Sequence, residues 1–115
     1  MNEFNQLKST LLWASIDADD CSIDCDSMVK LESNYEKFVE MIPDWIVDTL
    51  DDICFANGNV YEQLAHDYIM TRMRHGVGFW ETSDWEKRAG EVLTGLCHIQ
   101  GDLETYTDNN KLYIL

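Results

Sequence analysis

The feature that most constrains the fold is an apolar helical stripe in residues 60–81 that contains an arginine. Apolar residues recur there at the three- and four-residue spacing of one helix face, at Val60, Tyr61, Leu64, Ala65 and Tyr68. Arg72 follows Tyr68 by one helical turn and therefore falls in the same stripe. Because a guanidinium stays charged, a core-facing arginine requires a partner. We expect Arg72 to be buried against a carboxylate, and Glu81 is the nearest one able to fold back on it.

The same stretch concentrates the side chains best suited to a site, which are His66, Asp67, Arg72, His75, Phe79, Trp80 and Glu81. Gly76 ends the predicted helix, and the aromatic residues after it are expected to plug the core. The cluster fits two interpretations: a buried structural network, or a small-ligand or catalytic site. His66 and His75 lie about 180° apart on a helix, so the helix alone does not bring them to one metal ion. We therefore predict neither a metal nor a cofactor.

The composition predicts one globular domain over residues 1–115. Of these residues 45% are apolar and 11% aromatic, which is enough for a single modest core. No apolar run approaches the roughly 20 residues of a membrane helix, and no signal peptide opens the chain. These features predict a cytoplasmic protein with no membrane contact. The four cysteines, at positions 21, 25, 54 and 97, are then expected to be free thiols.

Acidity is the strongest global feature. The chain has 22 acidic and 8 basic residues, for a net charge of −14. Binding to nucleic acid requires basic residues that neutralise phosphate, so direct binding is not expected. A protein with a basic surface is the natural partner. Acidity that serves only solubility is the alternative interpretation.

Much of this charge lies on one side of a predicted helix over residues 28–53. Its apolar positions keep their spacing through Pro43, which predicts one long helix kinked there or two helices in a shared register. The opposite side carries the acidic face, composed of Glu32, Glu36, Glu40, Asp44, Asp48, Asp51 and Asp52. On a helix these acids would form a negative ridge about 30 Å long. Trp45 beside the ridge is a candidate apolar anchor for a partner.

The amino-terminal quarter is predicted to form a helix and a loop. Residues 2–15 show helical apolar spacing, with Leu12 and Trp13 widening the apolar face. Residues 17–26 hold five aspartates without hydrophobic periodicity, which indicates a loop. This loop lacks the glycine and the bidentate glutamate of a calcium-binding EF-hand, so we interpret it as solvated.

The carboxyl-terminal third is predicted to form a helix and a hairpin. A capping box from Ser83 to Glu86 opens a helix that runs to about Ile99. Residues 103–115 alternate around the turn residues 108–110, which predicts a two-stranded hairpin whose exposed edge could support a homodimer. The predicted fold is therefore mainly α (α+β), with four to five helices in one small domain and a C-terminal β-hairpin.

Residues 66–81 resemble a motif of small acidic proteins from tailed bacteriophages. The motif is H-D-[aromatic]-x-x-T-R-x-x-H-G-x-G-F-W-[DE], and it is similar to the run from His66 to Glu81. The opening Leu12-Trp13-Ala14-Ser15, the acidic loop and the tyrosine-bearing hairpin resemble the same group. This chain departs from the group by lacking a glycine in the acidic loop and by carrying Pro43. The resemblance implies a phage origin and an accessory role in the host-cell cytoplasm, and it implies no particular reaction.

The predicted function is that of a non-enzymatic phage accessory protein that binds a host protein through the acidic face. By occupying a basic groove, such a protein could act as a nucleic-acid mimic and inhibit a host defence or nucleic-acid-processing enzyme. One alternative is a small-ligand-binding or catalytic protein that uses His66, Arg72, His75 and Glu81. A second alternative is a structural homodimer.

Overall fold

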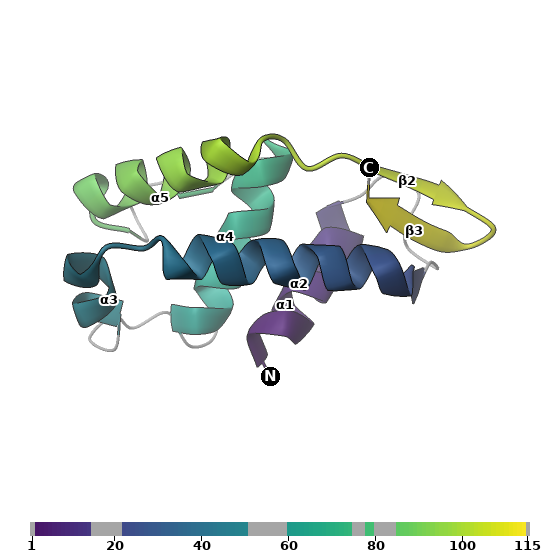
Figure 1. Cartoon of the computed structure of the whole chain (residues 1–115), viewed down its shortest axis with the longest axis horizontal. Coiled ribbons are helices and arrows are strands. Elements are labelled where there is room, and N and C mark those ends of the chain that lie inside the picture. Colours follow the sequence, from purple (N-terminus) through teal and green to yellow (C-terminus); the bar gives the residue numbers. More distant parts are fainter. Residues whose placement is uncertain (1, 15–21, 51–59, 75–77, 80–84, 115) are drawn as a thin grey trace.

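The computed structural model describes residues 2–14, 22–50, 60–74, 78–79 and 85–114, which form five helices and a three-stranded sheet (Figure 1). The elements in chain order are α1 (Asn2–Ala14), β1 (Ser22–Ile23), α2 (Cys25–Glu40), α3 (Asp44–Leu50), α4 (Val60–Met73), α5 (Lys87–Gln100), β2 (Thr105–Asp108) and β3 (Lys111–Ile114). This arrangement confirms the mainly α prediction with a C-terminal hairpin.

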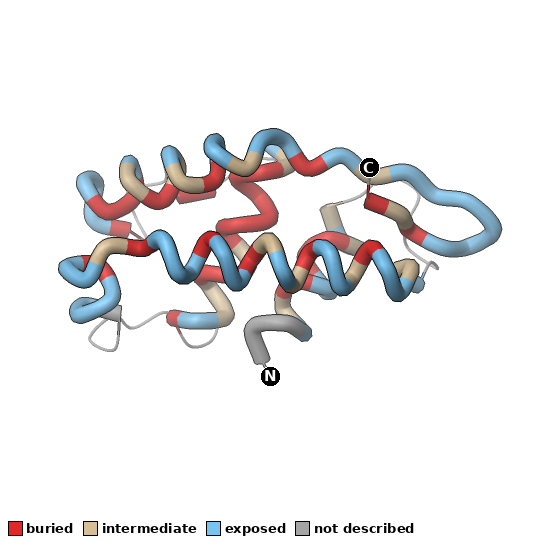
Figure 2. The backbone as a smooth tube through the Cα atoms, viewed as in Figure 1, coloured by how far each residue is buried: buried red, intermediate tan, exposed pale blue. Residues whose placement is uncertain are grey.

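Helix α4 is the central helix of the core. Helices α2 and α5 run across the axis of α4 in Figure 1, and α1 packs on α4 in the most extensive contact between two helices. Every residue from Asp67 to Arg72 is buried, so α4 is enclosed on most of its circumference at that level. The buried surface of α4 at that level is therefore wider than the single apolar stripe that the sequence predicts. Figure 2 shows the buried residues of α2, α4 and α5 facing one shared interior.

A chain of aromatic rings joins the helices within that interior. Phe38 of α2 lies 4.7 Å from Tyr68 of α4 and 5.8 Å from Phe79, measured between ring centroids. Phe79 in turn meets Trp85 edge-on at 5.4 Å. Aromatic pairs at such distances add to the stabilisation that their burial provides. Phe79 is 1% exposed, which confirms that it plugs the core, whereas Trp80 lies outside the described residues.

The predicted helix over residues 28–53 is two helices separated at residues 41–43. Pro43 lacks a backbone N–H and disfavours helical geometry in the residue before it, so α2 ends and α3 begins at Asp44. Ile42 and Ile46 remain buried on either side of the break, as a shared register requires. Figure 1 shows α3 turning away from the axis of α2. The acids therefore do not form the single straight ridge that the sequence predicts.

Helix α5 begins later than the capping box predicts. The Glu86 side chain is its N-cap and accepts hydrogen bonds from the backbone N–H groups of Arg88 and Ala89. Trp85 precedes the helix and is 2% exposed, so its burial fixes where the helix can start. Ser83 lies outside the described residues.

The hairpin has the predicted position and turn. Strands β2 and β3 pair antiparallel, with Tyr106 opposite Tyr113 and Asp108 opposite Lys111. Asn109 and Asn110 have φ values of 51° and 64°, the left-handed pair that a two-residue hairpin turn requires. Strand β1 pairs parallel to β3, which leaves β2 as an edge strand. The sequence analysis missed β1 because two residues are too few to show alternation.

Two glycines of α5 provide a matched test of this packing. A Cβ added at Gly90 would lie 2.3 Å from the carbonyl oxygen of Phe79, whereas a Cβ at Gly95 would meet nothing within 4 Å. We expect Gly90→Ala to lower the free energy of unfolding by about 1–3 kcal/mol through overpacking. Gly95→Ala should raise it by about 0.5–1 kcal/mol, because alanine favours a helix interior. Urea unfolding of both variants tests this, and two changes of the same sign would contradict the packing described.

Candidate functional site

The described part of the acidic face lies on the outer sides of α2 and α3. Glu36, Glu40, Asp44 and Asp48 are exposed and Glu32 is half-buried, while Asp51 and Asp52 lie outside the described residues. None of these five acids forms an ion pair with a basic residue in the part of the chain that the structure describes. The acids of the face on α2 run from Glu32 to Glu40, so its share of the face is about 12 Å long. The face therefore presents acids without a described ion pair on two successive helices, α2 and α3.

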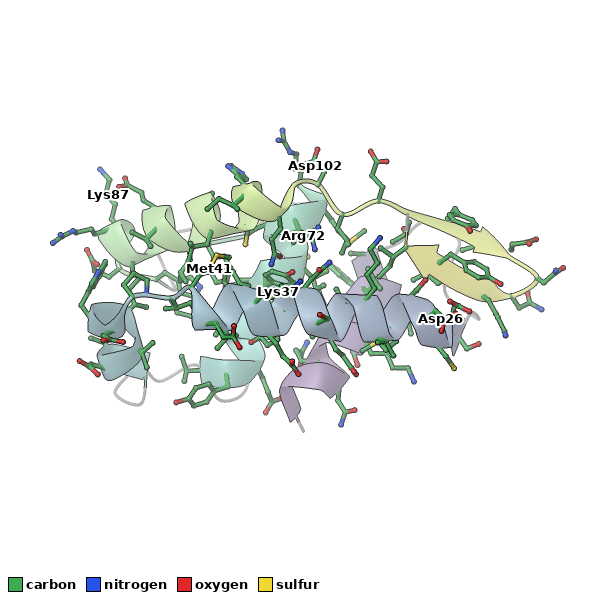
Figure 3. The ribbon with its side chains drawn as sticks, in the orientation of Figure 1. Asp26, Lys37, Met41, Arg72, Lys87 and Asp102 are labelled. Atoms are coloured by element: carbon green, nitrogen blue, oxygen red, sulfur yellow. The ribbon has the colours of Figure 1, made fainter. Side chains whose placement is uncertain are left out.

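Exposed apolar side chains accompany these acids. Val29 is 64% exposed, and Val39 and Met41 are each 39% exposed. Figure 3 shows Lys37 on α2 and Met41 at the C-cap of that helix, so the surface is mixed and carries some positive charge. Trp45 is 42% exposed, as an anchor would need to be, but the Arg88 guanidinium lies 5.1 Å from its ring centroid. A partner that used Trp45 would have to displace or share that cation.

Arg72 is buried, as predicted, and its described partners are oxygens near the end of α5. Its Nε and Nη2 atoms donate to the carbonyl oxygens of Gly101 and Gln100, at 3.1 and 3.3 Å. Its Nη1 atom donates to the Tyr68 hydroxyl at 3.1 Å. The last carbonyls of a helix carry the negative end of its dipole, so a guanidinium is well suited to this position. The expected partner Glu81 lies outside the described residues, as does His75. Figure 3 shows Arg72 where α4 approaches this end of α5.

Tyr68 extends this contact into a network that joins three helices. Its hydroxyl donates to the Gln100 side-chain oxygen at 2.5 Å, and the Gln100 amide donates to the carbonyl oxygen of Asn34 at 2.7 Å. Helices α4, α5 and α2 are therefore connected by consecutive hydrogen bonds. Burial raises the pKa of Tyr68 to about 12, although Arg72 opposes that shift. Burial also raises the pKa of the nearby Cys97 thiol to about 12, so neither group is a reactive anion at neutral pH.

A second network surrounds Asp67, which is buried and only 1% exposed. Its Oδ2 accepts from the Trp85 indole at 2.6 Å, and its Oδ1 accepts from the Gln63 amide at 2.9 Å. The His66 Nδ1 atom lies 3.0 Å from the same Oδ1. The structure thus divides the predicted cluster: Asp67 and His66 belong to this network, and Arg72 belongs to the other.

Sequence reasoning missed Gln63, Trp85 and Gln100 as partners in the two networks. The four-residue spacing of Gln63 and Asp67 is a local signal that could have identified that pair. Trp85 and Gln100 contact residues 18 and 32 positions away, at separations for which the sequence holds no periodic signal.

The described residues contain no group of three or more His, Cys, Asp or Glu side chains able to hold a metal ion. The described cysteines, Cys25 and Cys97, are free thiols. Among the same residues, no helix is both long and apolar enough to cross a membrane.

Comparisons of the chain with protein-family models, curated proteins and solved structures give no match. The resemblance seen in residues 66–81 therefore stays a prediction.

Removing the Arg72 guanidinium should destabilise the fold strongly. Arg72→Met keeps the apolar stem but leaves the Tyr68 hydroxyl and two carbonyl oxygens without their donor. We expect the free energy of unfolding to fall by about 2–5 kcal/mol, measured by urea denaturation. Arg74→Ala is the control, because Arg74 forms an exposed ion pair with Asp102 at 2.8 Å. It should cost at most about 1 kcal/mol. Equal losses in both variants would mean that Arg72 does not hold α5 as described.

Alkaline pH should destabilise the protein because the buried Tyr68 hydroxyl and Cys97 thiol hold their protons more tightly in the folded chain than in the unfolded chain. The unfolded chain releases the Cys97 proton near pH 9.0 and the Tyr68 proton near pH 10.0, whereas the folded chain holds both to about pH 12. Their contribution is complete below pH 9 and is lost as the pH rises towards 12. The slope per group is about 1.4 kcal/mol per pH unit. Between pH 9 and 10, Cys97→Ala should flatten the measured fall in stability. The exposed Cys25→Ala is the control, and an unchanged slope in Cys97→Ala would contradict the prediction.

Proposed function

We propose that this chain is a non-enzymatic accessory protein, of bacteriophage type, that binds a host protein with a basic surface. The observation that supports this most directly is the outer side of α2, where exposed Glu36 and Glu40 stand beside exposed Val29 and Val39. If the surface served only solubility, exposed acids would be sufficient. Apolar side chains exposed on the same rigid helix are what a binding surface adds.

The two kinds of side chain have different roles in such a complex. The acids attract a basic surface over a distance and speed its association, and salt weakens that attraction. Apolar side chains exclude water at the centre of the contact and supply much of the affinity. Val29, Val39 and Met41 can take this second role on α2, and Trp45 can take it on α3 once Arg88 is displaced.

The basic groove of a nucleic-acid-processing or defence enzyme is the host surface that we favour. Glu32, Glu36 and Glu40 follow at four-residue intervals, so they are about 6 Å apart along the helix. Phosphates of one nucleic-acid strand are about 3.4 Å apart along its axis. Helix α2 is thus less densely charged than nucleic acid, and apolar contacts must supply the difference. The protein would compete best for a groove that also has an apolar patch.

Charge reversal on α2 tests the proposal. The parent protein is used to capture partners from host cells, which mass spectrometry identifies, and the captured protein is then purified for affinity measurement. Glu36→Lys/Glu40→Lys should weaken that affinity by at least tenfold, because lysines would then face a basic surface. Rising salt should weaken the parent complex, and duplex DNA should displace the partner from it.

A second charge reversal distinguishes the effect of the acidic face on binding from the effect of the net charge. Glu91→Lys/Glu104→Lys changes the net charge by the same amount, at exposed acids outside α2 and α3. This variant should retain the partner. Equal losses in the two variants would show that binding depends only on net charge, and that result would overturn the proposal. Circular dichroism of both variants confirms that the fold is unchanged.

A further inference from the structure

A small cavity, open to solvent, lies at the surface between α1 and α4, away from the acidic face. Its volume is about 190 Å³, and it is lined by Gln6, Ser9, Thr10, Trp13 and His66. The α1 residues follow at three- and four-residue intervals, so they form one side of that helix. Trp13, which is expected to widen the apolar face of residues 2–15, is 68% exposed. Most of the indole surface therefore faces solvent at the cavity.

The buried Asp67 sets the chemistry of His66 in this cavity. Both Asp67 oxygens act as hydrogen-bond acceptors, Oδ1 towards Gln63 and Oδ2 towards Trp85. The tautomer that fits an accepting Oδ1 has its proton on Nδ1 of His66, which lies 3.0 Å from that oxygen. In the neutral ring this leaves Nε2 as a hydrogen-bond acceptor. The His66 side chain is 34% exposed, so a ligand can reach it.

The other groups that line the cavity restrict the class of ligand that it can bind. The Ser9 and Thr10 hydroxyls can donate or accept, and the Thr10 oxygen already accepts from the Gln6 amide at 2.9 Å. An indole surface favours an aromatic ring. An enclosed apolar cavity of about 150 Å³ holds benzene, and this more open cavity has space for one ring with a small substituent. The net charge of −14 disfavours an anionic ligand.

We propose that this cavity binds a phenol, with the phenol hydroxyl donating to Nε2 of His66 and the ring lying against Trp13. A phenol oxygen both donates and accepts, so it can also receive a hydrogen bond from Ser9. The phenol can be a free small molecule or the tyrosine side chain of a partner protein. The site is separate from the acidic face and does not depend on the function proposed for that face.

Titration calorimetry with p-cresol and toluene tests the proposal. Both molecules have one ring and one methyl group, and only p-cresol has the hydroxyl. We expect p-cresol to bind saturably at one site and toluene to bind about tenfold more weakly, as the loss of one hydrogen bond implies. Equal binding of the two molecules, or no saturable binding of p-cresol, would overturn the proposal.

Variants locate the site and identify the source of the ring. Trp13→Ala and His66→Ala should each weaken p-cresol binding by at least fivefold. His98→Ala is the control, because His98 is an exposed histidine on α5, and it should leave binding unchanged. Trp13 is on the surface, so its variant stays folded even if His66→Ala does not.

N-acetyltyrosinamide is the third probe, and it adds peptide backbone groups to the phenol ring. Affinity equal to that of p-cresol assigns the site to a tyrosine side chain, and weaker affinity assigns it to a free phenol. Unaltered p-cresol affinity in Trp13→Ala would overturn the assignment.

Discussion

The rest of the structure depends on the hydrogen bonds that Arg72 makes near the end of α5. A guanidinium that is 5% exposed needs partners, and the Gln100 and Gly101 carbonyl oxygens need donors because the helix ends there. Each group satisfies the other, and the contact fixes the position of α5 against α4. The backbone carbonyl of Arg72 also accepts from the Leu103 N–H at 2.9 Å, so the segment leading into the hairpin is held at the same place.

Helix α4 therefore holds α5 near both of its ends. Asp67 binds the Trp85 indole just before α5 begins, and Arg72 binds the backbone where α5 finishes. Between these points Gly90 allows the backbone of α5 to approach Phe79 closely. Buried polar groups make such positions specific, because any other placement would leave a charge or a carbonyl without a partner. This explains how a chain with a single modest core keeps a defined arrangement of helices.

The same arrangement separates the two surfaces on which the functional proposals depend. Helix α2 is held by Tyr35 and Phe38 on its inner side and through the Asn34 carbonyl, so its outer side remains exposed with its acids. The tight contact of α1 with α4 places Thr10 and His66 at one cavity. Asp67 connects that cavity to the core, since it binds both His66 and Trp85. A ligand at His66 would thus contact a residue whose orientation the core determines.

The sequence alone determined the features that depend on short spacings. Helical periodicity located α1, α2 and α4 and placed Arg72 on a buried face, and the turn residues at 108–110 located the hairpin. Only the tertiary structure decided which groups meet. The Arg72 contacts with Gln100 and Gly101, the Asp67 contact with Trp85 and the pairing of β1 with β3 all join positions far apart in the chain. A local pattern shows which side of a helix is buried, because burial repeats with the helical period. The identity of a partner depends on how whole elements approach one another, which is why the direction that α3 takes after Pro43 and the cavity beside His66 appear only in the folded chain.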